Sequence, residues 1–139
     1  MKYLLDTCLL SELIKPDPSP KVVEWLSSQD EDHLFISVLT IGEILKGIGK
    51  LPKGRKRLRL QTWVDHDLQN RFKAKVLPID AEVAETWGSI SAEAEKKGRK
   101  LPAIDGLLAA TAIANGLTVV TRNTKDIESP GANCINPWK

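Results

Sequence analysis

Residues 3–16 read YLLDTCLLSELIKP and join an apolar run, an aspartate and a second apolar pattern. Residues 2–6 are typical of a buried parallel strand, and apolar residues then recur at helical spacing over 9–14. Asp6 stands at the end of the predicted strand, where a carboxylate is costly to take out of water unless it is partnered. We therefore expect Asp6 to be solvated, hydrogen-bonded or bound to a cation.

The same alternation of short β runs and helical patterns continues along the chain. Further strands are predicted at 33–38, 75–78, 117–121 and 133–135. Helices are predicted at 22–26, at 40–51, at 58–71, from the N-cap Asp80 to the C′ residue Gly98, and from Pro102 to Gly116. Apolar strands separated by helices indicate a mainly parallel sheet covered on both faces. We predict an α/β fold with four to five strands, formed as one domain over residues 1–139.

Composition limits the class of protein further. The chain has 139 residues, of which 42% are hydrophobic and 27% charged, which excludes disordered and fibrous classes. Its most hydrophobic segment, 104–120, is interrupted by Asp105 and Asn115, and no basic region precedes an apolar leader. We expect a soluble, cytoplasmic protein with no membrane segment.

Cysteine and histidine give no sign of a soft metal site. Cys8 and Cys134 lie in apolar surroundings without a CxxC spacing, so buried free thiols are favoured over a disulfide. His33 and His66 are isolated. A metal, if one is bound, is therefore expected to be held by oxygen.

Four acids are predicted to meet at one edge of the sheet. Sites in parallel α/β sheets form beyond the carboxyl ends of the strands, where Asp6 lies. Asp105 opens a helix, Asp126 follows the fourth strand, and Glu43 lies early in the helix after the second. Taken singly, Asp105 as a first-turn acid, Glu43 as a solvated helix residue and Asp126 as a turn residue remain open alternatives.

A basic stretch follows Glu43, with no acid before Asp65. It is either a solvated helix face or a binding surface for phosphates, and the residues alone leave both open because aromatic residues for base stacking are absent from it. Its members are Lys46, Lys50, Lys53, Arg55, Lys56, Arg57 and Arg59.

The chain resembles a known family in four fragments. In order, LLDTCLLSEL, SVLTIGEILKGI, PAIDGLLAATAIANGLTVVTRN and TKD are similar to segments of the PIN-domain ribonucleases, specifically the VapC and FitB type of toxin. The resemblance implies a PIN-like α/β/α sandwich with a metal site built from four acids. The matching positions here are Asp6, Glu43, Asp105 and Asp126.

The resemblance also implies supporting polar residues. Thr7, Thr121 and Asn123 match positions at which the family places small polar side chains. Cys8 stands where many relatives have asparagine, and Ile127 where an aromatic residue often follows the last acid. Neither departure removes a carboxylate.

The implied activity is a metal-dependent endoribonuclease that cleaves RNA phosphodiester bonds by metal-activated water. Hard oxygen ligands favour Mg²⁺ or Mn²⁺. Asp6 and Asp105 are expected to be the principal ligands, Glu43 a ligand or water-orienting base, and Asp126 a ligand through water or to a second ion. Ser37 and Thr40 are further polar candidates, and helix capping is enough to explain Thr40.

The expected partners are RNA, a cognate antitoxin and a second copy of the chain. With such a site, the basic stretch becomes a candidate RNA-backbone surface, with Lys96, Lys97, Arg99 and Lys100 as an opposite bank. The antitoxin and the homodimer are implications of the resemblance. Trp25 and Leu26 are candidates for an antitoxin groove, although core packing is the commoner role, and helices around Trp63 or Trp87 are candidate dimer faces.

Two other functions were weighed against catalysis on RNA. The first is a catalytically silent PIN-like module that binds protein or RNA, and the presence of all four acids argues against it. The second is an aspartate-based phosphatase or phosphoacceptor domain. A phosphatase of that kind would be expected to carry a D-x-D motif, and Cys8 occupies the place of its second aspartate.

Overall fold

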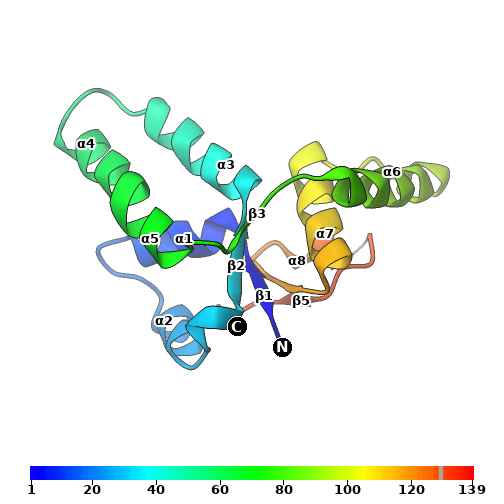
Figure 1. Ribbon diagram of the computed structural model, residues 1–139, viewed down its shortest axis with the longest axis horizontal. Helices are drawn as coiled ribbons and strands as arrows, with labels where there is room; N and C mark the ends of the chain where they lie inside the picture. Colours follow the sequence, from blue (N-terminus) through cyan, green and yellow to red (C-terminus); the bar gives the residue numbers. More distant parts are fainter. Residues whose placement is uncertain (129) are drawn as a thin grey trace.

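The computed structural model in Figure 1 describes residues 1–128 and 130–139. A central sheet has the strand order β3-β2-β1-β4-β5, and every pairing is parallel. The strands are β1 (Tyr3–Leu5), β2 (Leu34–Ser37), β3 (Val76–Leu77), β4 (Thr118–Val120) and β5 (Cys134–Ile135). All five lie inside or at the predicted runs, so the parallel sheet is confirmed, with shorter strands than predicted.

Helices fill the intervals between the strands. They are α1 (Thr7–Leu13), α2 (Pro20–Ser27), the short 3-10 helix η1 (Glu31–His33), α3 (Val38–Gly49), α4 (Arg55–Thr62), the π-helix η2 (Trp63–Leu68), α5 (Gln69–Arg71), α6 (Ala81–Lys96), α7 (Ala103–Asn115) and α8 (Thr124–Glu128). The predicted helix over 58–71 is thus three successive segments with different hydrogen-bond spacing. Asp126, for which a turn residue was the open alternative, lies in the short helix α8 after β4.

Polar caps and glycines set several helix ends. Asp80 caps α6 through Val83 N–H, as predicted, and Gly116 ends α7 in the left-handed conformation at φ 67°. The prediction for Thr40 was wrong: Ser37 caps α3 by accepting from Leu39 N–H, and Thr40 lies inside the helix. In the described chain the buried Thr40 hydroxyl has no hydrogen-bond partner.

Two apolar clusters cover the two faces of the sheet. In β1, Leu5 belongs to the cluster shared with α1 to α4, whereas Leu4 belongs to the cluster shared with α7 and α8. Both side chains are fully buried, as expected when successive residues of a strand point to opposite faces. Figure 1 shows α1, α3 and α4 on one side of the sheet and α6 and α7 on the other. The three-layer α/β/α arrangement is confirmed.

Aromatic and sulfur side chains complete the packing. Trp25 makes an edge contact with Tyr3, with ring centroids 5.0 Å apart, which supports a core role for it. Cys8 and Cys134 are free thiols, as expected, but both are half-buried rather than buried. Partial burial raises the pKa of Cys134 to about 11. Within the described residues, no helix has the length and apolarity that a membrane span requires.

A buried carboxylate joins distant parts of the chain. Glu12 of α1 is 5% exposed and accepts from Ser19 N–H (2.9 Å), Trp138 Nε1 (3.2 Å), Lys15 Nζ (3.2 Å) and Arg122 Nη2 (3.2 Å). The backbone N–H of Ser19, then Trp138, and then Lys15 lower the pKa of Glu12 to about 2. Glu12 therefore ties α1 to the segment before α2 and to the end of the chain.

We expect Glu12→Gln to lower the free energy of unfolding near neutral pH, because an amide cannot satisfy the same cationic donors. The folded pKa of Glu12 lies below the ordinary value of 4.5, so its contribution is complete above that pH and is lost as the pH falls toward about 2. Urea unfolding should show that the difference in free energy of unfolding between the wild type and Glu12→Gln becomes smaller below about pH 4. A difference in unfolding free energy that stays constant down to about pH 2 would contradict this role. A similar loss of unfolding free energy in the control Glu24→Gln, on α2, would contradict it as well.

Candidate functional site

The carboxyl ends of β1 and β4 meet beside an open hollow. Asp6 N–H donates to the carbonyl of Val120 at 3.0 Å, which places Asp6 next to the end of β4. The hollow has a volume of about 590 Å³. Residues from four parts of the chain line it: Asp6, Thr7, Cys8, Ser11, Glu43, Asp105, Arg122 and Asn123. Three of the four acids singled out in the sequence therefore share one cavity.

The Asp6 carboxylate is held by three neighbours. As the N-cap of α1, it accepts from Thr7 N–H through Oδ1 at 2.7 Å. Its Oδ2 accepts from Thr121 Oγ1 at 2.7 Å and lies 3.6 Å from Cys8 Sγ. These contacts explain how an acid is tolerated after a buried strand.

Thr7 links two of the acids. Its backbone N–H binds Asp6, and its hydroxyl donates to Glu43 Oε1 at 2.7 Å. Glu43 is an exposed residue of α3, so this contact fixes an otherwise mobile carboxylate at the rim of the hollow. The first turn of α1 thus sets the distance between Asp6 and Glu43.

Asn123 organises the segment after β4. Its backbone N–H donates to Thr121 Oγ1 at 3.0 Å, and its side-chain amide donates to Asp126 Oδ2 at 2.8 Å. Asp126 does not line the hollow itself. It stands behind Asn123 in α8, at the margin of the acid group.

Asp105 experiences the charge of all the other acids. It is half-buried in the first turn of α7. Burial raises its pKa first, and repulsion from Asp126, Asp6 and Glu43 raises it further. A cation among these carboxylates would relieve the repulsion.

Close packing fixes the start of α7. A Cβ atom at Gly106 would lie 3.2 Å from Trp87 Nε1, so the helix carrying Asp105 approaches α6 more closely than most residues allow. Asp105 therefore projects from a helix turn whose backbone is held against Trp87.

Cys8 and Arg122 also line the hollow, although neither was predicted as a site residue. Cys8 Sγ lies 3.6 Å from Thr121 Oγ1 and accepts from Arg122 N–H at 3.5 Å, and burial followed by the charge of Asp6 raises the thiol pKa. Arg122 was not predicted as a site residue. Its position in the TRN segment, between two residues that were predicted, was the available signal.

The basic stretch is divided by the structure. Lys46 and Lys50 line a groove of about 480 Å³ that shares Glu43 with the acid hollow, and Lys56 lines a smaller cavity that also reaches Glu43. Arg57 donates to the carbonyl of Leu51. Arg55 and Arg59 lie instead at an apolar hollow on α4.

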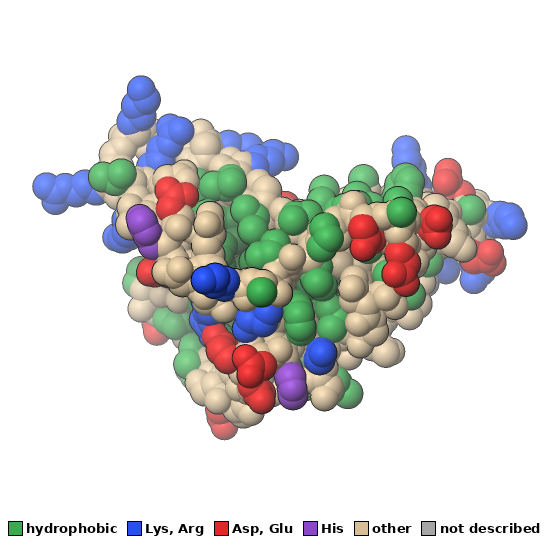
Figure 2. All heavy atoms as spheres, in the orientation of Figure 1, with side chains coloured by type: hydrophobic (Ala, Val, Ile, Leu, Met, Phe, Trp, Pro, Cys, Tyr) green, Lys and Arg blue, Asp and Glu red, His purple; other side chains and the backbone are tan. Residues whose placement is uncertain are grey.

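Figure 2 shows basic side chains gathered over α3 and α4, and basic side chains mixed with acidic ones at the far end of α6, with the surface hollowed between the two. The second group contains the predicted bank at 96–100. Of its members, Lys100 lines a hollow beside Trp87. The two basic groups therefore stand on opposite arms of the molecule.

The donor set fits a hard divalent cation in its chemistry. All candidate ligands in the acid group supply carboxylate oxygen, which suits Mg²⁺ or Mn²⁺. Among the described residues, no three acidic, histidine or cysteine side chains form a ready-made cage. An open arrangement agrees with Mg²⁺, which is usually held by one or two carboxylates while waters and substrate phosphates complete its shell.

Comparison with known proteins gives full-length similarities. The chain is 33% identical over 136 residues to VapC ribonuclease Y4jK of Sinorhizobium fredii, covering 98% of this chain and 97% of that protein. It is 34% identical over 135 residues to Toxin FitB of Neisseria gonorrhoeae, covering 97% of each chain.

A solved structure shows the same fold. The crystal structure of FitAcB from Neisseria gonorrhoeae matches with a TM-score of 0.93 and 34% identity, over 98% of both chains. The PIN domain family matches residues 3–129. On this match and on the full-length identities, the chain belongs to the PIN domain family.

Proposed function

We propose that the protein is a divalent-metal-dependent endoribonuclease and the toxin of a toxin–antitoxin pair. The observation that carries this proposal is the meeting of Asp6, Glu43 and Asp105 in one open hollow at the carboxyl ends of parallel strands. Membership of the PIN family supports it, as do relatives named VapC ribonuclease and Toxin FitB. Residues 1–139 would act as one PIN-like domain, and the cytoplasm, where RNA is present, stays the predicted location.

The chain's own residues would divide the work as follows. Asp6 and Asp105 hold Mg²⁺ or Mn²⁺, with Thr121 and the Thr7 N–H orienting Asp6. Glu43 is a further ligand or orients water, and Asp126 adds negative charge from behind Asn123. When bound, the ion supplies a water activated for attack on phosphorus and offsets charge on the phosphate.

A silent binding module would have no need for this arrangement. Burial and the repulsion of three neighbouring carboxylates raise the pKa of Asp105, and this repulsion is an electrostatic cost in a protein without a cation. Hydrogen bonds from Thr7 and Thr121 hold two of these acids in place. The arrangement favours catalysis over the alternative.

The primary test is cleavage of a panel of structured RNAs by antitoxin-free protein in Mg²⁺, in Mn²⁺ and in EDTA. We expect cleavage that requires metal and falls more than about 100-fold in Asp6→Asn, since losing even an outer partner of a metal ligand commonly costs about 10–100-fold. Asp17→Asn, an exposed acid before α2, serves as the matched control and should cleave normally.

A negative result would be informative if metal binding is measured in parallel. Intact RNA from folded protein that also fails to bind Mn²⁺ by calorimetry would refute the enzymatic proposal. Intact RNA with Mn²⁺ bound in the wild type and lost in Asp6→Asn would keep the metal site and indicate a substrate outside the panel.

RNA is proposed to approach along α3. Glu43, Lys46 and Lys50 lie on one helix face, and all three line the groove that continues from the acid hollow. Such lysines would neutralise backbone phosphates on one side of the cleavage point without reading the base sequence. The arginines of the stretch contribute less in this arrangement, because Arg55 and Arg59 line the apolar hollow on α4 and Arg57 donates to the Leu51 carbonyl.

We expect the double substitution Lys46→Gln and Lys50→Gln to weaken RNA binding and to flatten its salt dependence. Losing two phosphate contacts to a single strand should reduce the slope of log K against log salt by about 1.4. Fluorescence anisotropy at several salt concentrations measures both effects. Lys2→Gln with Lys73→Gln, at exposed positions before β1 and β3, is the matched control, and an equal change there would contradict the groove.

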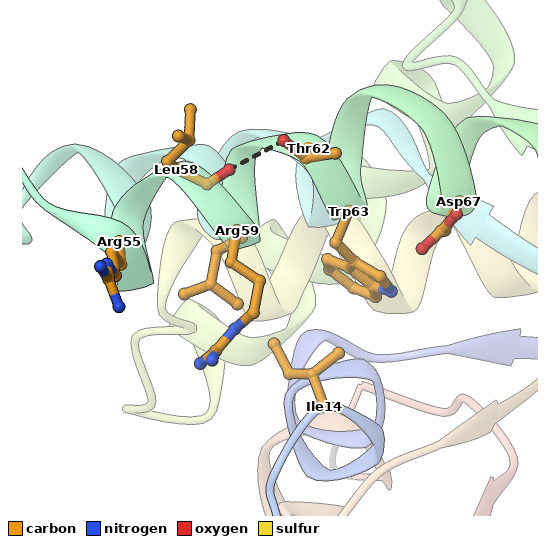
Figure 3. Close-up of a pocket in the computed structure, with 8 residues that line it drawn as sticks. Ile14, Arg55, Leu58, Arg59, Thr62, Trp63 and Asp67 are labelled. Atoms are coloured by element: carbon orange, nitrogen blue, oxygen red, sulfur yellow. Dashed lines mark hydrogen bonds between the residues drawn. The ribbon is translucent and has the colours of Figure 1, made fainter.

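The antitoxin is proposed to dock on the apolar hollow of α4. Figure 3 shows Trp63 of η2 and Ile14, at the end of α1, pointing toward one another across this hollow, which has a volume of about 590 Å³. Arg55 and Arg59 also line it, so it suits an apolar segment that carries acidic residues. The relative named Toxin FitB, together with the similar structures named FitAB and FitAcB, supports a toxin's partner of this kind.

We expect Ile14→Ala to weaken binding of the cognate antitoxin about tenfold, because the truncation removes apolar contact area from the hollow. The side chain is 37% exposed in the free protein, so folding should be little affected. Ile113→Ala on α7, where the residue is 40% exposed, is the matched control. Calorimetric titration with the antitoxin measures the affinity of both variants. If Ile14→Ala and Ile113→Ala bind the antitoxin equally well, the antitoxin does not dock on this hollow.

A homodimer remains part of the proposal. The exposed Trp87 on α6 offers apolar surface on the arm opposite the antitoxin hollow. Ile104 on α7 is also exposed but lines the groove proposed for RNA, so the dimer is proposed to pair through Trp87.

A further inference from the structure

Arg122 is the cationic side chain that lines the acid hollow. It follows Thr121 directly, and its side chain is 55% exposed, so it reaches solvent beside Asp6 and Asp105. The acids of this hollow would repel a phosphodiester on their own. A positive group held beside these acids would weaken their repulsion of a phosphodiester.

Two side chains hold the guanidinium in place. Its Cζ lies 4.4 Å from the centroid of the Trp138 ring, and its Nη2 donates to Glu12 Oε1 at 3.2 Å. Trp138 Nε1 donates to the same Glu12 oxygen at 3.2 Å, so ring and carboxylate are themselves joined. Stacking on the Trp138 ring and pairing with Glu12 already restrict the Arg122 side chain. It therefore loses less conformational entropy when it binds a ligand than a free arginine would.

The partner of Arg122 is not an acid of the proposed metal site. Within the described residues its ion pair is with Glu12, a buried residue of α1, and its backbone N–H donates to Cys8 Sγ. A guanidinium paired with Asp6 or Glu43 would neutralise a metal ligand. Held by Glu12 through Nη2, the half-exposed guanidinium has further N–H donors with which to bind an incoming anion.

We propose that Arg122 binds a backbone phosphate of the RNA at the acid hollow, and that Glu12 and Trp138 are positioning residues for it. This inference rests on the proposed ribonuclease function. Arg122 would stand on one side of the acids, and Lys46 and Lys50 on the α3 side, so that the strand is held on both sides of the cleavage point. Planar forked donors suit phosphate better than a point charge does.

The competing explanation is purely structural, in which Arg122 only fastens the end of the chain. The protein contains a matched control for it. Arg71 also pairs with a carboxylate, Glu31, at 2.6 Å, and also lies near a ring, Phe72, at 5.9 Å. Arg71 precedes β3, an edge strand, whereas the acid hollow lies at the carboxyl ends of the inner strands β1 and β4.

The test compares Arg122→Gln, Arg122→Lys, Trp138→Leu and Arg71→Gln with the wild type. Anisotropy of a labelled single-stranded RNA in EDTA, at several salt concentrations, gives affinity without cleavage. We expect Arg122→Gln to bind about tenfold more weakly, the effect of one charge-assisted hydrogen bond, with the salt slope reduced by about 0.7. Arg122→Lys should keep the slope and recover part of the affinity. Arg71→Gln should change neither.

Kinetics in Mn²⁺ supply the second readout. Arg122→Gln should raise KM by about tenfold with a smaller change in kcat, because a phosphate beside the reacting bond is bound in both ground and transition states. Trp138→Leu should raise KM by less, since the cation remains but its position is looser. Melting temperatures show whether any variant is simply unfolded.

The outcomes separate this inference from the function on which it rests. Affinity, slope and KM unchanged in folded Arg122→Gln would overturn it, even if the wild type cleaves RNA normally. Binding that depends on Arg122 in a protein that cleaves nothing with metal would retain the phosphate contact and refute the ribonuclease. RNA that does not bind the wild type at all would overturn it as well.

Discussion

The hydrogen bond from Thr121 to Asp6 is the interaction on which the rest of the site depends. It joins residues 115 positions apart, at the ends of the neighbouring strands β1 and β4, and fixes the acid that also begins α1. Thr7, next to Asp6, hydrogen-bonds Glu43 on α3. On the other side, Asn123 hydrogen-bonds both Thr121 and Asp126 on α8. Two threonines and an asparagine thus connect the geometry of the sheet to three of the four carboxylates, Asp6, Glu43 and Asp126.

Features set by local chemistry could be predicted from the sequence. Apolar runs located all five strands, and Asp80 and Gly116 marked helix ends, because caps and strand patterns depend on a few adjacent residues. The four acids were chosen by position and by resemblance, and the structure brings three of them into one hollow. Their metal-binding roles stay predictions.

Features set by distant contacts could not be predicted. Arg122 gains its position from Glu12 and Trp138, and Glu12 is buried by partners as far as 126 residues away. The basic stretch reads as one surface, yet the turn between α3 and α4 sends its members to different hollows. The π-helix inside the predicted 58–71 helix has no local sequence mark, since tertiary packing decides such a change of spacing.

The contact between Trp138 and Glu12 also orders events during synthesis. A ribosome makes α1 early, but the carboxylate of α1 stays without its ring partner until residue 138 has emerged. The Asp6 contact with Thr121 waits in the same way for β4. A nascent chain carrying only the first three strands therefore has Asp6 and Glu43 without Asp105 or Arg122, so the hollow is assembled only late in translation.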